Sequence, residues 1–271
     1  MRSNSFSVLM AVYYRDDPAL FFLALSSVYE NSVMPSQLVL VQDGPVGEAL
    51  TNVISSFQSR PGFQLVRINR NVGLAAALNE GLRYITSDFV FRADSDDINL
   101  PNRFATQLPL LIEGLDLVGS SILEIDRNSR PIAIRRPPLS ASDIRVFVTK
   151  RNPFNHMTVA FRRSVVLRAG GYPNIHLKED YALWATMIAG GASCQNIEEV
   201  LVHANAGLSM YKRRGGLRYV RSEIEMQTNL VRLGLQSFWS AVFVGCARSV
   251  VFLFPTSLRG FIYEKFLRNK A

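Results

Sequence analysis

The stretch Phe89-Val90-Phe91-Arg92-Ala93-Asp94-Ser95-Asp96-Asp97 is the part of the sequence from which the fold is most readily predicted. Residues 89–93 form a short, largely apolar run that is typical of a buried strand, and a cluster of carboxylates follows it at once. Two earlier apolar runs lead in the same way into Asp43 and Asn71. The carboxyl ends of parallel strands meet at one edge of a sheet, and ligands bind beyond that edge. We therefore expect Asp43, Asn71 and Asp94 to gather at a binding site.

The rest of the chain alternates apolar runs with helical patterns, which predicts an α/β fold with a mostly parallel central sheet flanked by helices. Strands are expected at 7–14, 38–41, 64–68, 89–93, 115–125, 158–161 and 200–203, and helices at 18–31, 48–59, 74–85, 102–112 and 179–189. Asp17 and Pro18 supply a cap and a first-turn proline for the first helix. After Gly215 and Gly216, a long helix is expected from Leu217 towards Gly234.

Composition limits the class of protein. With 271 residues, 48% of them apolar, the chain can bury a substantial core, which excludes a disordered protein and a small disulfide scaffold. Cys194 and Cys246 are the only cysteines, so we expect neither a structural zinc site nor a disulfide framework. Residues 1–14 lack the features of a signal peptide, which predicts a cytoplasmic protein.

The net charge of +8 belongs to the C-terminal quarter of the chain. Residues 1–204 hold 19 basic and 19 acidic side chains, whereas residues 205–271 hold 11 basic and 3 acidic ones. This tail mixes basic with aromatic residues, a combination that suits an anionic membrane surface, and no nucleic-acid-binding motif accompanies the charge. We therefore expect membrane contact and no nucleic acid partner. The alternatives are a tail that packs on the core or one that forms an oligomer interface.

The tail is not expected to span the membrane. Its most apolar stretch, 238–254, contains Arg248 and is closed by Pro255, so it falls short of the roughly 20 residues that a spanning helix needs. The following residues, 258–266, place apolar side chains at helical spacing between basic ones. This pattern predicts a helix that lies in the membrane interface.

Carboxylates that follow a buried strand repel one another unless a cation lies among them. Mg²⁺ or Mn²⁺ fits oxygen ligands best, and Mg²⁺ is usually bound by one or two carboxylates together with substrate phosphates. The cluster Asp94–Asp97 therefore predicts a divalent cation and a phosphate-bearing substrate. The alternative is a solvated acidic turn.

Five segments together resemble a family 2 glycosyltransferase of the GT-A (nucleotide-diphospho-sugar transferase) fold. They are Ser7–Tyr14, Gln42–Gly44, Asn71–Gly81, Ala93–Asp97 and Lys178–Trp184. The resemblance covers residues 5–215 and is greatest to bacterial enzymes of exopolysaccharide and surface-polysaccharide synthesis. It implies a GT-A catalytic domain at 1–204, with a nucleotide-donor half at 1–105 and an acceptor half at 106–204. A helical extension occupies 205–271.

The resemblance also implies roles for individual residues. Asp180, the second residue of the family's acidic pair, corresponds to the catalytic base, and Asp94 and Asp96 correspond to the DxD motif, with Asp96 as the direct metal ligand and His203 as a further candidate. The residues expected to bind the donor are Ala11, Tyr13, Asp43 (at the nucleobase), Asn71, Gly73, Asn79, Asp94, Ser95, Arg213 and Arg214. On the acceptor side we expect Glu179, His156 and Trp184. Each also has a structural alternative: Asp180 suits a helix N-terminus, and a lone histidine is often a packing residue.

The activity that the resemblance implies is inverting, metal-dependent transfer of one sugar. The expected donor is a nucleotide-diphospho-sugar, most simply a UDP-sugar, and the acceptor is a glycan or lipid-linked saccharide. The chain lacks the QxxRW-type motif of processive polysaccharide synthases, which favours single-sugar addition. The competing hypothesis is a non-catalytic module that binds sugar nucleotides or glycans at a membrane-associated assembly complex.

Overall fold

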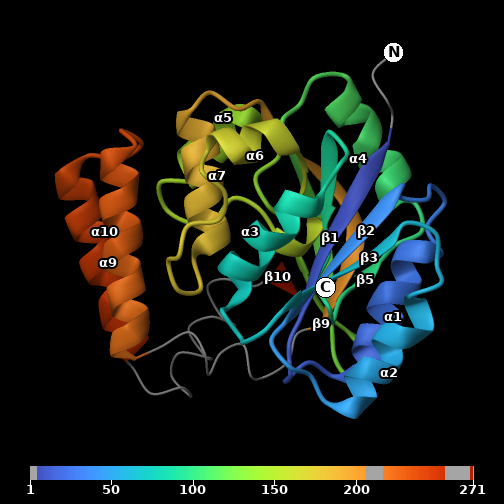
Figure 1. Ribbon diagram of the computed structural model, residues 1–271. Coiled ribbons are helices and arrows are strands. Elements are labelled where there is room, and N and C mark those ends of the chain that lie inside the picture. Colours follow the sequence, from blue (N-terminus) through green and yellow to red (C-terminus); the bar gives the residue numbers. More distant parts are fainter. Residues whose placement is uncertain (1–4, 206–215, 254–268, 271) are drawn as a thin grey trace.

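A single curled sheet runs through the molecule, with helices packed on both of its faces (Figure 1). This computed structural model describes residues 5–205, 216–253 and 269–270. The strands are β1 (Phe6–Val12), β2 (Gln37–Asp43), β3 (Phe63–Ile68), β4 (Phe89–Arg92), β5 (Ile98–Asn99), β6 (Leu117–Ile125), β7 (Pro131–Arg135), β8 (Ala160–Arg162), β9 (Cys194–Asn205) and β10 (Asn269–Lys270). The helices are α1 (Pro18–Tyr29), α2 (Glu48–Phe57), α3 (Leu74–Tyr84), α4 (Arg103–Ile112), α5 (Ala141–Phe147), α6 (Arg163–Arg168), α7 (Glu179–Ala189), α9 (Leu217–Arg232) and α10 (Phe238–Leu253), with a 3₁₀ turn at His156–Thr158.

The sheet is parallel in its first half and mixed beyond it. Strands β3, β2, β1 and β4 are parallel neighbours, and the helices between them provide the crossovers that parallel strands need. β8 then pairs antiparallel with both β4 and β6, and β6 and β7 form an antiparallel hairpin around the turn at Asp126–Arg130. Parallel pairing recurs beyond the first half, because β6 and β9 are also parallel neighbours. The expected α/β fold is confirmed, with antiparallel pairs added by β5, β7 and β8.

Side chains of β1 alternate between two hydrophobic clusters, one on each face of the sheet. Leu9 belongs to the cluster under α3 and α7, whereas Val8 and Met10 belong to the cluster under α1, α2 and α4. Both clusters also contain residues from beyond position 106, including Trp184 in the first and Ala160 in the second. The core and the sheet are therefore continuous across the expected division between donor and acceptor halves.

The sequence predicted the strongly patterned elements and missed the weakly patterned ones. Asp17 caps α1 as expected, since its Oδ1 accepts a hydrogen bond from the backbone N–H of Ala19 at 2.9 Å. By contrast, β9 extends over twelve residues instead of the expected four. Its two ends pair with β6, and the register shifts between them. This shift breaks the alternation of apolar residues by which a strand is predicted. The short elements β5, β7, α5 and α6 were also missed.

Residues 216–253 of the extension form a helical pair, α9 and α10, that lies beside α7 (Figure 1). Residues 269–270 form β10, which pairs with β7. Met226 and Leu230 of α9 are buried in the cluster that contains α7. The segment 258–266, expected to be an interfacial helix, lies outside the described residues. Among those that are described, no helix combines the length and the apolar character needed to cross a bilayer. Of the two cysteines, Cys194 is buried in β9 and Cys246 is exposed on α10.

Candidate active site

The carboxylate cluster lies where β4 ends, and it is bracketed by the loop after β1 and by the end of β9. Ser95 Oγ donates a hydrogen bond to Asp16 Oδ2 at 2.9 Å, and the backbone N–H of Asn205 donates to Asp97 Oδ1 at 2.9 Å. Arg92, the last residue of β4, is 1% exposed and forms an ion pair with Asp94. The DxD segment is thus held between three parts of the chain.

Burial, followed by the charges of neighbouring carboxylates, raises the pKa values of this cluster. Burial, with the charges of Asp94 and Asp16 added to it, raises the pKa of Asp96 to about 7, and burial raises the pKa of Asp16 to about 6. Burial and the charges of Asp96 and Asp94 hold the pKa of Asp97 well above its ordinary value. Each of these three carboxyl groups is therefore harder to ionise than an aspartate in water.

This donor set fits a divalent cation. Its oxygen ligands are of the kind that Mg²⁺ and Mn²⁺ prefer, and the electrostatic repulsion among them is what a cation relieves. Within residues 5–205 and 216–253, no three acidic, cysteine or histidine side chains form a ready cluster of ligands. Two carboxylates completed by substrate phosphates are the usual arrangement for Mg²⁺. His203 lies on β9, opposite Ile98 of β5, and is not part of a described ligand cluster.

Asp43 and Asn71 gather at the sheet edge as expected, and the contacts between them are explicit. Asp43 Oδ2 accepts hydrogen bonds from Asn71 Nδ2 at 3.0 Å and from the N–H of Gly73 at 2.9 Å, and Asp43 Oδ1 accepts from the N–H of Val72 at 2.7 Å. The carboxylate that was expected to reach a nucleobase is thus occupied in shaping the loop 71–73. A side chain at Gly44 would meet the backbone of Asn71, which is 2.6 Å from its Cβ position.

Other residues expected to bind the donor differ in position. Ala11 is partly buried in β1, and the backbone N–H of Tyr13 donates to Asp16 Oδ2 at 3.0 Å, beside the carboxylate cluster. Asn79 has a structural partner. Its amide donates to the carbonyl of Tyr172 and accepts from the N–H of Tyr172, both at 2.8 Å, so it fixes α3 to the loop after α6. Arg213 and Arg214 lie outside the described residues.

Asp180 lies in the first turn of α7 and has a defined orientation. Asn152 Nδ2 donates to its Oδ2 at 2.6 Å, and the N–H of Tyr181 donates to its Oδ1 at 2.7 Å. The preceding acidic residue, Glu179, has a pKa raised to about 7, first by burial and then by the charge of Asp180. When Asp180 is ionised, ionisation of the neighbouring Glu179 is therefore unfavourable.

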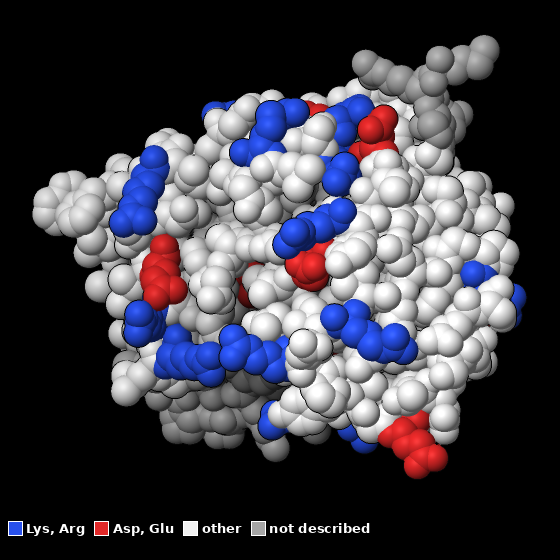
Figure 2. All heavy atoms as spheres, in the orientation of Figure 1, with Lys and Arg blue, Asp and Glu red and all other residues white. Residues whose placement is uncertain are grey.

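Acidic residues at the end of β4 and at the start of α7 are both within electrostatic reach of Tyr172. Burial raises the pKa of Tyr172, which feels the positive charge of Arg92 and the negative charges of Asp180, Asp94 and Glu179. The carboxylates of the two motifs, more than eighty residues apart in sequence, are thus within electrostatic reach of one tyrosine and one arginine. Figure 2 shows the molecule hollowed beside α3, with acidic side chains among basic ones on this face.

Trp184 does not line an acceptor site, contrary to expectation. It is 0% exposed, and its indole packs against Phe154, Phe161 and Tyr172 in the core. His156 packs on the same aromatic group, 3.3 Å from the hydroxyl of Tyr172. Burial, followed by the charge of Arg92, holds the pKa of His156 well below its ordinary value, so the ring is neutral.

Sequence reasoning missed five residues of this site: Asp16, Arg92, Asn152, Tyr172 and Asn205. A signal existed for two of them. Arg92 is a charged residue inside an apolar run, and Asp16 directly follows the first strand. The other three lie on loops or strand ends whose positions depend on tertiary contacts.

The fold is that of the GT-A glycosyltransferases. The mannosyltransferase PcManGT from Pyrobaculum calidifontis, solved in complex with GDP-Man and Mn²⁺, superposes with a TM-score of 0.65 over 93% of this chain and 77% of that structure, at 17% identity.

The chain belongs to glycosyl transferase family 2, whose model matches residues 7–171. It is 39% identical over 266 residues to the UDP-Gal:alpha-D-GlcNAc-diphosphoundecaprenol beta-1,3-galactosyltransferase of Escherichia coli, covering 97% of both chains. It is 34% identical over 262 residues to the amylovoran biosynthesis glycosyltransferase AmsE of Erwinia amylovora, covering 96% of this chain and 98% of that one. Both of these relatives are bacterial glycosyltransferases, and the second is named for polysaccharide biosynthesis.

Proposed function

We propose that this chain is an inverting, metal-dependent glycosyltransferase that moves one hexose from a nucleotide-diphospho-sugar to a lipid-linked saccharide. Two carboxylate pairs, Asp94 with Asp96 and Glu179 with Asp180, support the proposal. The observation that carries it is that Asp94, Glu179 and Asp180 all lie within electrostatic reach of the buried Tyr172. One pair suits the diphosphate of a donor and the other suits the hydroxyl of an acceptor.

The relatives narrow the substrates to test. The Escherichia coli relative is named for UDP-Gal and for an acceptor carried on diphosphoundecaprenol. That relative spans the same length as this chain, so we propose UDP-galactose as the first donor and a GlcNAc-diphospho-lipid as the first acceptor. The product would be one galactose longer than the acceptor.

In the proposed mechanism, Asp180 removes the proton of the acceptor hydroxyl as its oxygen attacks the anomeric carbon from the face opposite the nucleotide. The bond to the nucleotide diphosphate breaks as the new glycosidic bond forms, which inverts the anomer. Asn152 and the N–H of Tyr181 hold the carboxylate of Asp180 in a fixed orientation for this step. Mg²⁺ or Mn²⁺, held by Asp94 and Asp96, would supply positive charge at the departing diphosphate.

We also propose that the enzyme lies peripherally on the inner face of the plasma membrane. Phe238, Trp239 and Phe243 of α10 are 61%, 78% and 76% exposed. The helix contains no acidic residue. An apolar helix face without acidic charge, in the basic part of the chain, suits an anionic bilayer that also carries the lipid-linked acceptor.

The test is a transfer assay with UDP-galactose and a synthetic GlcNAc-diphospho-lipid, with Mn²⁺, Mg²⁺ or a chelator. Asp180→Asn should retain donor binding and lose turnover by about 10²-fold or more, the usual scale for a general base. Normal turnover in this variant would remove Asp180 from the proposed role, and activity that survives chelation would contradict the metal requirement. Donor binding without transfer by the unaltered protein would favour the non-catalytic module.

A further inference from the structure

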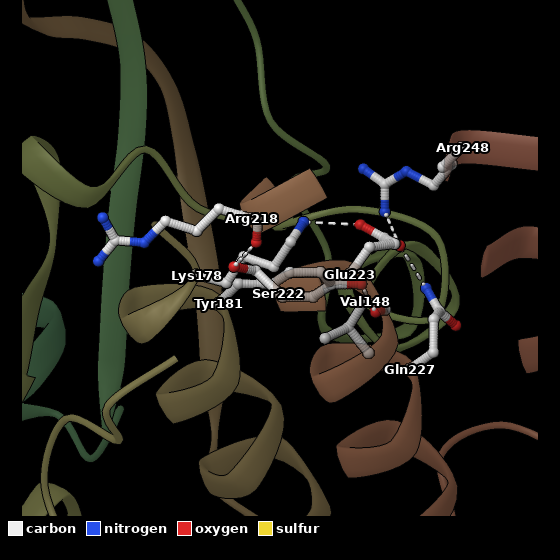
Figure 3. Close-up of polar contacts among 8 residues, drawn as sticks. All are labelled: Val148, Lys178, Tyr181, Arg218, Ser222, Glu223, Gln227 and Arg248. Atoms are coloured by element: carbon white, nitrogen blue, oxygen red, sulfur yellow. Dashed lines mark hydrogen bonds and ion pairs between the residues drawn. The ribbon is translucent and has the colours of Figure 1, made fainter. Parts of the chain in front are cut away.

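A buried ion pair joins the C-terminal helices to the residue just before the acidic pair of α7 (Figure 3). Lys178 Nζ lies 2.7 Å from Glu223 Oε2 of α9, and the two side chains are 4% and 0% exposed. Lys178 is the residue from which α7 begins, and Glu179 and Asp180 follow it directly. The side chain of Lys178 therefore ties the start of α7 to α9.

Glu223 is also held from the other helix of the pair. Arg248 of α10 lies 3.0 Å from its Oε1, on the side away from Lys178, and Gln227 Nε2 donates to the same oxygen at 2.8 Å. Burial by itself would raise the pKa of Glu223, but Lys178 and Arg248 lower it below its ordinary value. The carboxylate thus remains charged inside the protein and links α9, α10 and the start of α7.

Two aromatic rings enclose the ammonium group of Lys178. Its Nζ lies 4.8 Å from the ring centroid of Tyr219 on α9 and 5.8 Å from that of Phe252 on α10. The rings meet edge to face with centroids 4.6 Å apart. Cation–π attraction is strongest where the cation is desolvated, as it is here. The side chain of Lys178 consequently has little freedom to leave Glu223.

The backbone at this point explains why the link matters. Leu177 has φ of +57°, a conformation that a bulky L residue rarely adopts. No side chain caps the start of α7. A strained residue persists only where its surroundings determine the conformation, and the buried side chain next to it provides such a determinant.

We infer that Lys178 and Glu223 are positioning residues that set the place of Asp180 against the DxD carboxylates. This inference rests on the proposed role of Asp180 as the base. The helical pair α9 and α10 is then part of the catalytic machinery and not only an attachment to the membrane. Turnover should depend on the Lys178–Glu223 pair even where donor binding and folding do not.

The experiment compares Lys178→Met and Lys178→Arg in the transfer assay, with kcat and the donor KM measured separately. Lys178→Met should lower kcat about 10- to 100-fold, because small displacements of a catalytic group have effects of this size, while the donor KM changes less than about threefold. Lys178→Arg, which keeps the charge, should restore most of kcat. Glu225→Gln is the matched control. Glu225 lies on α9, as Glu223 does, but it pairs with Arg221 on the exposed side of that helix, so the kcat of this variant should be unchanged.

Circular dichroism and thermal melting separate misfolding from misplacement. If Lys178→Met does not fold, Glu223→Asp replaces it, because this variant keeps the charge and withdraws the carboxylate by one methylene. A folded Lys178→Met or Glu223→Asp with unaltered kcat would overturn the inference. The proposed function would still stand after such a failure, provided that Asp180→Asn is inactive in the same assay. Full turnover of Asp180→Asn would overturn both the proposed role of Asp180 and the inference about Lys178 and Glu223.

Discussion

At the scale of single residues, Glu179 predicts a distinctive dependence of stability on pH. Its pKa is raised in the folded protein from 4.5 to about 7, first by burial and then by Asp180. The folded state thus binds an extra proton between these values. The stability that this proton contributes is complete below about pH 4.5 and is lost as the pH rises through about 7.

Replacement of Glu179 by Gln should remove this loss. At pH 8 the variant should exceed the parent protein in free energy of unfolding by an amount on the order of 1 kcal/mol, and the difference should shrink at pH 5. Urea unfolding of both proteins at the two pH values measures it. Because the other buried carboxylates are common to both proteins, an identical pH dependence would mean that Glu179 ionises normally in the fold.

The two tryptophans provide a matched pair for separating core from surface. Trp184 is 0% exposed and Trp239 is 78% exposed. Trp184→Ala should cost about 3–5 kcal/mol of stability, the usual range for a buried aromatic residue, whereas Trp239→Ala should change stability by less than about 0.5 kcal/mol. Denaturant unfolding of both variants checks this. Similar losses at the two positions would show that α10 is buried against another surface in solution.

At the scale of elements, the exposed face of α10 predicts how the protein meets lipid. Replacing Phe238, Trp239 and Phe243 by Ser removes three large apolar contacts from that face without touching the buried side of the helix. Binding to phosphatidylglycerol vesicles should weaken at least tenfold, because burial of apolar side chains drives interfacial binding. Sedimentation with vesicles measures the change, at low and at high salt.

Val146→Ser is the control for this experiment. Val146 is 63% exposed on α5, outside the basic part of the chain, so vesicle binding should be unaffected. If the protein in which Phe238, Trp239 and Phe243 are replaced by Ser sediments with vesicles as the parent protein does, α10 is excluded as the lipid-binding face. High salt should weaken the binding of every variant, because it screens the basic side chains around α10.

At the scale of the whole molecule, the continuous sheet predicts that the two expected halves do not fold separately. β4 pairs with β8 and β5 pairs with β9, so residues 1–105 would leave strand edges unpaired that are internal in the full sheet. Both hydrophobic clusters would also lose members. A fragment of residues 1–105 should therefore lack a cooperative thermal transition by circular dichroism. A sharp transition for that fragment would show an independent donor domain.

The parts of this architecture that sequence could predict are those in which local pattern and tertiary structure agree. Asp17 and Pro18 start α1 where expected, and the apolar run of β4 leads directly into Asp94. The site residues that escaped prediction depend on distant partners. Asn152 acquires its place only when it meets Asp180 at the start of α7, and Asn205 acquires its place only when β9 reaches the DxD segment.

The misplaced expectation for Trp184 has the same cause. Trp184 lies in a segment that resembles the family, yet its neighbours in the fold enclose it in the aromatic core. Resemblance of a segment locates a site to within a few residues. Which of those side chains faces the substrate is decided by packing, and packing does not show in one local pattern.

The contrast between the two cysteines provides a built-in reporter. Burial raises the pKa of the Cys194 thiol to about 12, and its side chain is shielded within β9, whereas Cys246 is exposed on α10. Since the thiolate is the reactive form, a maleimide dye should attach to Cys246 alone, with no engineered position. A dye that brightens in apolar surroundings would then report whether α10 meets a bilayer, without any substitution in the chain and during turnover.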